Sequence, residues 1–146
     1  PEAQRYGLLR HSGSQAIAEA IGSLAATPID GATHIAPGIA AVPAPGHSPG
    51  SIIILVRLAN GREYLFIGDI AWSFDDITKL RTRPRFLQWL MFDPKEERGQ
   101  VLRQLRALHD LHLRKPALVI VPSHDNRWFD RLIAERLMKS AKAETR

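Results

Sequence analysis

The chain has 146 residues, of which 45% are hydrophobic and 24% charged, an ordinary composition for one globular unit. It contains no cysteine, which excludes disulfides, thiolate zinc sites and cysteine nucleophiles, so any metal must be bound by His, Asp or Glu. The formal net charge is +5, and no apolar run approaches the length that crosses a bilayer. We expect a globular chain in the cytoplasm, with the periplasm as the alternative, and no membrane partner.

The first half of the chain predicts a helix followed by strands. Residues 1–30 carry a helix-like apolar pattern, and residues 39–42 predict a short strand between a glycine and a proline. Residues 51–58 and 64–67 predict two further strands, and Asn60 with the glycine after it is a strong hairpin signal between them. Because these two strands are apolar at most positions, a layer of helices should cover them.

The second half is predicted to be mainly helical. Asp93, followed by proline and by Glu96 three residues later, has the form of a capping box at a helix start. Apolar residues then recur at helical spacing until Pro116. Residues 118–121 predict a buried strand, and Asp125 or the next residue is expected to cap a last helix. The predicted core face of that helix is Phe129, Leu132, Ile133 and Leu137. The order of elements indicates an α/β layered fold.

Three polar residues lie in loops or at the ends of predicted strands, where packing does not require a polar side chain. His47 lies in a loop stiffened by Gly and Pro, Asp69 follows a predicted strand and a glycine, and His124 follows another predicted strand. Loops anchored to strand ends commonly hold catalytic groups. Neutral imidazole is a good zinc ligand, and a carboxylate can bridge two cations. Each residue alone has an ordinary structural explanation, whereas the three together indicate a metal site.

The local sequences around these residues resemble one known family. Residues 44–50 (APGHSPG) are similar to the T-P-G-H-T-P-G loop of the metallo-β-lactamase superfamily. Residues 66–69 (FIGD) resemble its strand that ends in Gly-Asp, and residues 121–125 (VPSHD) resemble its final strand and histidine. The three motifs occur in the family's order. On these motifs the chain is identified as a member of the superfamily, in its lactonase and glyoxalase II-like branch.

The resemblance implies a four-layer αββα sandwich, of which residues 1–146 would be the C-terminal part of one domain. This half would hold a mixed, largely antiparallel sheet with flanking helices. It also implies two metal ions, zinc or alternatively manganese or iron. His47 would ligate the first ion and His124 the second, while Asp69 would bridge both and act in catalysis. A water activated by the metals would attack the carbonyl of a lactone, ester, thioester or amide.

The chain departs from the family in one large respect. The H-x-H-x-D-H motif, which supplies the remaining metal ligands, does not occur in it. We therefore expect the chain to be a truncated part of the fold that is inactive alone. The sheet face that packs on the other half would be a large apolar surface. The expected partners are the missing N-terminal half or a second copy of the chain.

Several other residues could contribute to the site or to the packing around it. Trp72 and Phe74 could form an apolar wall for the acyl part of a substrate, or could equally be core residues. Asp125 could orient His124 as well as cap a helix. Ser48 could hydrogen-bond within the His47 loop. His109 is expected to be a half-buried residue whose polar atoms are satisfied.

A metal-dependent hydrolase of a small acyl compound is the leading functional interpretation. Hydrolysis of β-lactam antibiotics is less favoured, because enzymes with that activity commonly use a cysteine ligand. The alternative is a nuclease of the same fold, which the basic residues Arg81, Arg83 and Arg85 would permit. The absence of an inserted domain between Asp69 and His124 argues against nucleic acid as the partner. A non-catalytic, degenerate fragment is the remaining alternative.

Overall fold

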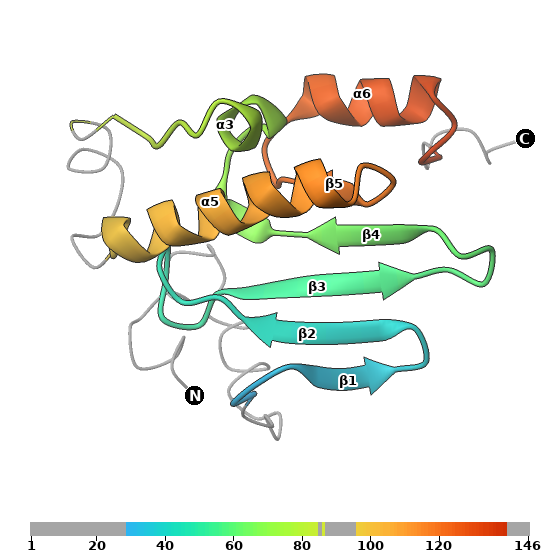
Figure 1. Ribbon diagram of the computed structural model, residues 1–146, viewed down its shortest axis with the longest axis horizontal. Coiled ribbons are helices and arrows are strands. Elements are labelled where there is room, and N and C mark those ends of the chain that lie inside the picture. The colour runs from blue at the N-terminus through green and yellow to red at the C-terminus, as the bar shows by residue number, and fades with distance from the viewer. Residues whose placement is uncertain (1–28, 85, 87–95, 140–146) are drawn as a thin grey trace, which may run out of the picture.

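The computed structural model describes residues 29–84, 86 and 96–139. A five-stranded mixed sheet with the strand order β1-β2-β3-β4-β5 forms its centre (Figure 1). The strands are β1 (Thr33–Ala36), β2 (Ile39–Pro43), β3 (Ile52–Arg57), β4 (Glu63–Phe66) and β5 (Val119–Val121). The helical elements are η2 (Gly68–Ile70), α3 (Phe74–Thr78), α5 (Arg98–Arg114) and α6 (Asn126–Ala134). This arrangement confirms the predicted α/β class, while the helix predicted over residues 1–30 falls almost wholly outside the described residues.

The Asn-Gly pair between β3 and β4 forms the predicted hairpin. The two strands are antiparallel, with Arg57 opposite Glu63 at the hairpin end. Oδ1 of Asn60 accepts from the backbone N–H of Arg62 at 3.0 Å, and Gly61 takes a φ of +82° that glycine adopts without strain. The side chain of Asn60 and the freedom of Gly61 together reverse the chain here.

The two faces of the sheet carry separate apolar cores, as strand alternation requires. On one face, strand residues such as Leu65 and Ile120 pack with Leu105 of α5 and Ile77 of α3. On the other face, strand residues including Val121 pack against α6. In the view of Figure 1, α5 runs across the sheet, with α3 and α6 above it. The predicted helix layer over the strands is therefore confirmed.

The buried face of α6 differs from the prediction at one position. Leu132 is fully buried, and Trp128, Phe129 and Leu137 pack around it, but Ile133 is 38% exposed. Trp128 and Leu132 are one helical turn apart and face the sheet, whereas Ile133 lies at the margin of this face, one residue before the helix ends at Ala134. The prediction of Ile133 as a core residue was wrong for this reason.

Helix α5 ends where predicted but begins later. It stops at Arg114, two residues before Pro116. At its start, Glu96 and Glu97 are not helical, and Glu97 occupies the N-cap position without a side-chain hydrogen bond. Asp93 lies outside the described residues. Among the described residues the helix begins at Arg98, and the Glu96 carboxylate contacts the distant residues His47 and Arg83.

Strand β1 was not predicted, and it depends on the turn that joins it to β2. Gly38 in this turn has a φ of +76°, and its carbonyl accepts from the backbone N–H of Arg57 at 2.7 Å. A Cβ atom at Gly38 would lie 2.5 Å from the carbonyl oxygen of Arg57. Glycine is therefore required here both for its backbone conformation and for the close approach of β3.

Substituting Gly38 and Gly61 separately distinguishes these two requirements. At Gly61 a Cβ atom would meet nothing within 4 Å, so Gly61→Ala is expected to cost only the backbone term, about 1 kcal/mol. Gly38→Ala has a similar φ and adds the clash with Arg57, so it should cost at least about 1 kcal/mol more. Urea unfolding followed by circular dichroism measures both. Equal losses of stability would contradict the role given to Gly38.

Candidate metal centre

Three loops that leave the same edge of the sheet carry the predicted site residues. Strands β2 and β4 run in the same direction because each is antiparallel to β3, and β5 is parallel to β4. Their C-terminal ends therefore lie along one edge. The loop after β2 carries His47, the turn after β4 carries Asp69, and the loop after β5 carries His124. Gly68, with a φ of +56°, allows the turn that brings Asp69 into this edge.

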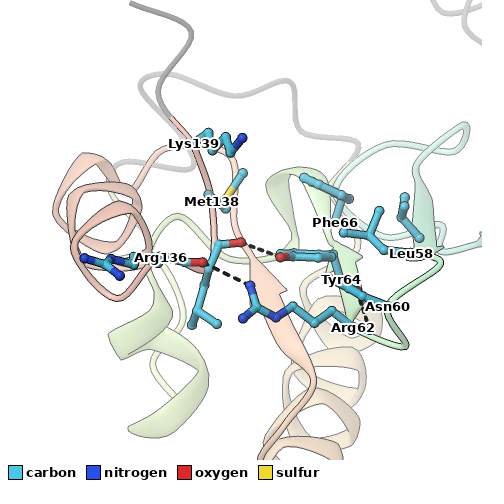
Figure 2. Close-up of a pocket in the computed structure, with 10 residues that line it drawn as sticks. Leu58, Asn60, Arg62, Tyr64, Phe66, Arg136, Met138 and Lys139 are labelled. Carbon is cyan, nitrogen blue, oxygen red and sulfur yellow. Dashed lines mark hydrogen bonds between the residues drawn. The ribbon is translucent and has the colours of Figure 1, made fainter. Parts of the chain in front are cut away.

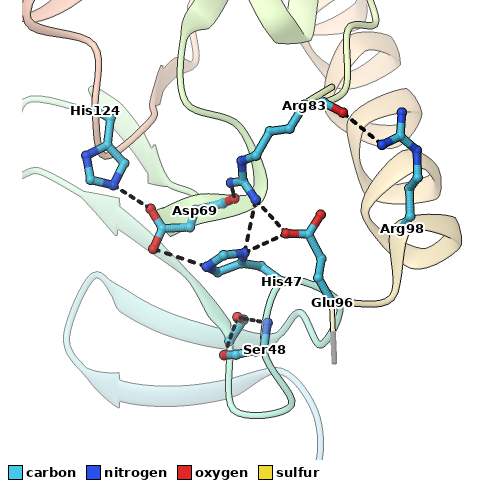
Figure 3. A network of polar contacts seen from close by, with 8 residues as sticks. His47, Ser48, Asp69, Arg83, Glu96, Arg98 and His124 are labelled. Atoms are coloured by element: carbon cyan, nitrogen blue, oxygen red, sulfur yellow. Dashed lines mark hydrogen bonds and ion pairs between the residues drawn. The ribbon is translucent and has the colours of Figure 1, made fainter. Parts of the chain in front are cut away.

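The side chains of these three residues meet, with Asp69 in the middle (Figure 3). Oδ1 of Asp69 lies 2.9 Å from Nε2 of His124, and Oδ2 lies 3.7 Å from Nε2 of His47. Although His124 is close, Oδ1 is buried without a hydrogen bond of acceptable geometry among the described residues. Each end of one carboxylate thus faces the outer nitrogen of a different imidazole.

The separations of these donor atoms suit cation ligands. Two ligands of a tetrahedral zinc ion, each about 2.0–2.1 Å from the metal, lie about 3.3 Å apart. The two nitrogen–oxygen separations, 2.9 and 3.7 Å, fall on either side of this value. A buried carboxylate oxygen without a hydrogen bond is costly unless a charge compensates it. The residues present therefore fit a metal centre.

No group of three His, Cys, Asp or Glu side chains surrounds a single point in the part of the chain that the structure describes. The two oxygens of the Asp69 carboxylate face different imidazoles, so the donors form two separate pairs. His47 and Oδ2 form one pair of donors, and His124 and Oδ1 form another. The described residues thus form two donor pairs that share Asp69, here called half-sites, and each pair falls short of the four ligands that zinc has in proteins.

A buried ion pair lies beside His47 that the sequence did not reveal. Arg83 and Glu96 have side chains 9% and 5% exposed, and Nη1 of Arg83 donates to Oε2 of Glu96 at 2.7 Å. The same Oε2 lies 3.0 Å from Nδ1 of His47, and Arg83 also donates to the backbone carbonyl of Asp69. The sequence predicts Arg83 as part of a basic surface with Arg81 and Arg85. Its burial removes it from any surface that could attract nucleic acid.

The loop that carries His47 is held on both sides. The carbonyl of Gly46 accepts from the backbone N–H of Glu97 at 2.8 Å, which joins the loop to the start of α5. Within the loop, the hydroxyls of Ser48 and Ser51 lie 2.8 Å apart, and the Ser51 hydroxyl accepts from the backbone N–H of Ser48. These contacts fix the position of the His47 backbone. Ser48 has the hydrogen bond within the loop that was expected of it.

Trp72 and Phe74 lie in different surroundings. The Trp72 ring is edge-on to His124, with centroids 6.2 Å apart, and the Arg83 guanidinium lies 4.8 Å from its centroid. Phe74 instead stacks on Trp128 with centroids 3.9 Å apart. Trp72 therefore lies beside one of the three candidate ligands, His124. The contacts of Phe74 favour the packing role over the acyl wall.

Asp125 and His109 serve the packing of helices. Oδ1 of Asp125 accepts from the backbone N–H of Trp128 at 3.0 Å and caps α6, as predicted. Its Oδ2 accepts from the backbone N–H of Phe74 at 2.9 Å. Asp125 thus ties the loop of His124 to the segment that follows Trp72, and its side-chain hydrogen bonds go to backbone groups and not to His124. Nδ1 of the half-buried His109 lies 3.1 Å from the carbonyl of Ile77, as expected of a satisfied residue.

A cavity of about 410 Å³ lies at the other end of β4, near the hairpin (Figure 2). Apolar residues of β3, β4 and the segment after α6 line it, including Phe66 and Met138. The side chains of Arg62 and Tyr64 donate to the carbonyls of Arg136 and Leu137 and hold that segment in place. Its lining does not include His47, Asp69 or His124.

Comparison with solved structures identifies the fold. The chain is similar to an N-acyl homoserine lactone hydrolase whose product, N-hexanoyl-L-homoserine, is bound at the catalytic metal center, with a TM-score of 0.53 and 16% identity. It is also similar to a variant of the B. thuringiensis protein AiiA with N-decanoyl-L-homoserine bound at the active site, with a TM-score of 0.53 and 17% identity. The fold is that of part of a metallo-β-lactamase domain.

The match to the metallo-β-lactamase fold is partial in length. The first of these alignments covers 78% of this chain but only 39% of the lactone hydrolase. A third structure, a quorum-quenching N-acyl homoserine lactone hydrolase, matches at a TM-score of 0.51 and 18% identity over 78% of this chain and 40% of its own. No protein-family model and no curated protein sequence matches the chain. No helix in the described ranges is long and apolar enough to cross a membrane.

Proposed function

We propose that the chain is part of a metal-dependent hydrolase that opens a small lactone, ester or thioester. The observation that carries this proposal is the position of the Asp69 carboxylate, with one oxygen facing His124 and the other facing His47. The fold shared with lactone hydrolases supports the same reaction class. The absence of cysteine leaves imidazole and carboxylate donors, which suit zinc first and manganese or iron as alternatives.

Each residue of the centre has a defined role in this proposal. His47 and His124 would each hold one ion, and Asp69 would hold both and fix their separation. Bound metal ions supply a nucleophilic water near neutral pH and polarise the substrate carbonyl. Arg83 holds the backbone carbonyl of Asp69, so that the bridging carboxylate keeps its position. Trp72 forms an apolar border beside His124, where the acyl part of a substrate would lie.

The proposal requires further ligands beyond the described residues. Two donors per half-site leave each ion short of the usual four ligands. The matched lactone hydrolases are about two and a half times as long as the aligned region, since only 39–40% of their length is covered. We infer that the missing ligands come from an N-terminal half of the domain or from a second copy of the chain. Turnover is therefore assigned to the assembled protein.

Metal binding tests the role of Asp69 directly. Asp69→Asn and His124→Ala should each weaken zinc binding by at least about tenfold, because each removes a donor from a half-site that has only two. Isothermal titration calorimetry on the 146-residue chain measures this effect. Asp110→Asn and His34→Ala are matched controls, since neither residue lies at this edge of the sheet, and they should leave binding unchanged. Zinc binding that depends on the controls and not on Asp69 would contradict the proposal.

Turnover tests the substrate class. The 146-residue chain with zinc should show no hydrolysis of N-acyl homoserine lactones above the buffer rate, whereas a protein that also supplies the missing ligands should hydrolyse them. In that assembled protein, Trp72→Ala should raise KM more for a decanoyl than for a butanoyl substrate. Lost burial of the longer chain costs about 0.8 kcal/mol per exposed CH₂. If Trp72→Ala raised KM equally for both acyl lengths, Trp72 would not contact the acyl group. Turnover by the isolated 146-residue chain would overturn the account of two incomplete half-sites.

A further inference from the structure

We propose that Glu96, held in place by Arg83, is a positioning residue for His47. It would fix the imidazole in the tautomer that carries its proton on Nδ1, so that Nε2 presents a lone pair toward Asp69. This inference rests on the proposed function, because it matters only if His47 binds a metal. It concerns residues that no motif in the sequence assigns to the site.

The geometry places a carboxylate at the inner nitrogen of His47. Oε2 of Glu96 lies 3.0 Å from Nδ1, and the opposite ring nitrogen, Nε2, faces Asp69 (Figure 3). Histidine ligands of metals commonly donate their second ring N–H to a carboxylate, which fixes both the tautomer and the ring orientation. Glu96 stands where such a carboxylate is needed. Its side chain is 5% exposed, so water offers Nδ1 little competition for this contact.

Nη1 of Arg83 also lies 3.0 Å from Nδ1, which raises an alternative in which Nδ1 is unprotonated and accepts a hydrogen bond from Arg83. In that tautomer Nε2 would carry the proton and donate toward Asp69. However, Nε2 and Oδ2 of Asp69 are 3.7 Å apart, which is too far for a hydrogen bond. A buried carboxylate gains more from two donors than from one, and Arg83 already donates to it at 2.7 Å. The Nδ1–H tautomer accounts for the Glu96 contact and for the long Nε2–Oδ2 distance, and it leaves Arg83 as a donor to Glu96 and not to Nδ1.

Arg83 makes this arrangement rigid. It is held at the Glu96 carboxylate, at the backbone carbonyl of Asp69 and over the ring of Trp72. A guanidinium can donate in several directions within one plane, so one side chain fixes the carboxylate and the turn of Asp69 together. Arg98 further donates to the backbone carbonyl of Arg83 at 2.8 Å. The buried ion pair that precedes α5 therefore contacts His47 directly and Asp69 at its backbone carbonyl.

The test uses two variants of the 146-residue chain. Arg83→Met with Glu96→Met replaces the buried ion pair by apolar side chains of similar length, a change that proteins often accept without loss of stability. It removes the two groups that contact Nδ1 in the described part of the chain. Glu96→Gln keeps an oxygen that can accept from Nδ1 and loses only the charge. Glu97→Gln is the matched control, because Glu97 is the exposed neighbour at the same helix start.

Two readouts follow His47 independently of activity. The ¹⁵N chemical shifts of the ring in the metal-free chain report the tautomer, which should be Nδ1–H in the wild type and shift toward Nε2–H in the double variant. Zinc affinity by calorimetry should fall by about 10–100-fold in the double variant and by less in Glu96→Gln. Glu97→Gln should match the wild type in both. A loss of stability without a change at His47 would not produce this pattern.

Each outcome decides a different claim. A wild-type His47 in the Nε2–H tautomer overturns the positioning role, whatever the stability of the variants. Wild-type zinc binding that the double variant retains in full also overturns it but leaves the proposed function standing. Failure of the wild-type chain to bind zinc through Asp69 and His124 overturns the proposed function itself. The predicted tautomer together with the graded loss of affinity supports both.

Discussion

The direction of the strands places the carboxylate of Asp69 between two imidazoles. Strands β2, β4 and β5 all end at one edge of the sheet, so the loops that follow them converge although they are far apart in sequence. Reversing any of these strands would move its polar residue to the hairpin end. The contacts of Oδ1 and Oδ2 with different imidazoles follow from this topology, as does the division of the site into two halves.

The sequence predicted those elements of the fold that carry strong local signals. Asn60 and Gly61 form the turn expected of them, Pro116 follows the end of α5, and Asp125 caps α6. Elements without such signals were missed. Strand β1 is largely exposed and shows no apolar alternation, so its existence depends on its pairing with β2 and on the turn at Gly38. Pairing with β2, and not the strand propensity of its own residues, makes this segment a strand.

The site was predictable only in part. The local sequences around His47, Asp69 and His124 indicated that they belong together, and the structure brings them together. Glu96 and Arg83 were assigned to a helix cap and a basic surface, because a sequence window shows only neighbours. They lie 49 and 36 residues from His47 along the chain. A charged residue whose partner is distant in sequence has no local pattern that reveals its burial, and only the fold supplies it.

The most direct test of the account is the location of bound metal. Crystals of the chain grown with zinc should show anomalous scattering at the absorption edge of the metal, within about 2.0–2.2 Å of a carboxylate oxygen of Asp69 and of Nε2 of His124 or His47. Such a peak at one or both ends of the carboxylate is the result that the account predicts. Zinc bound only at other histidines, with Asp69 free of metal, would contradict it.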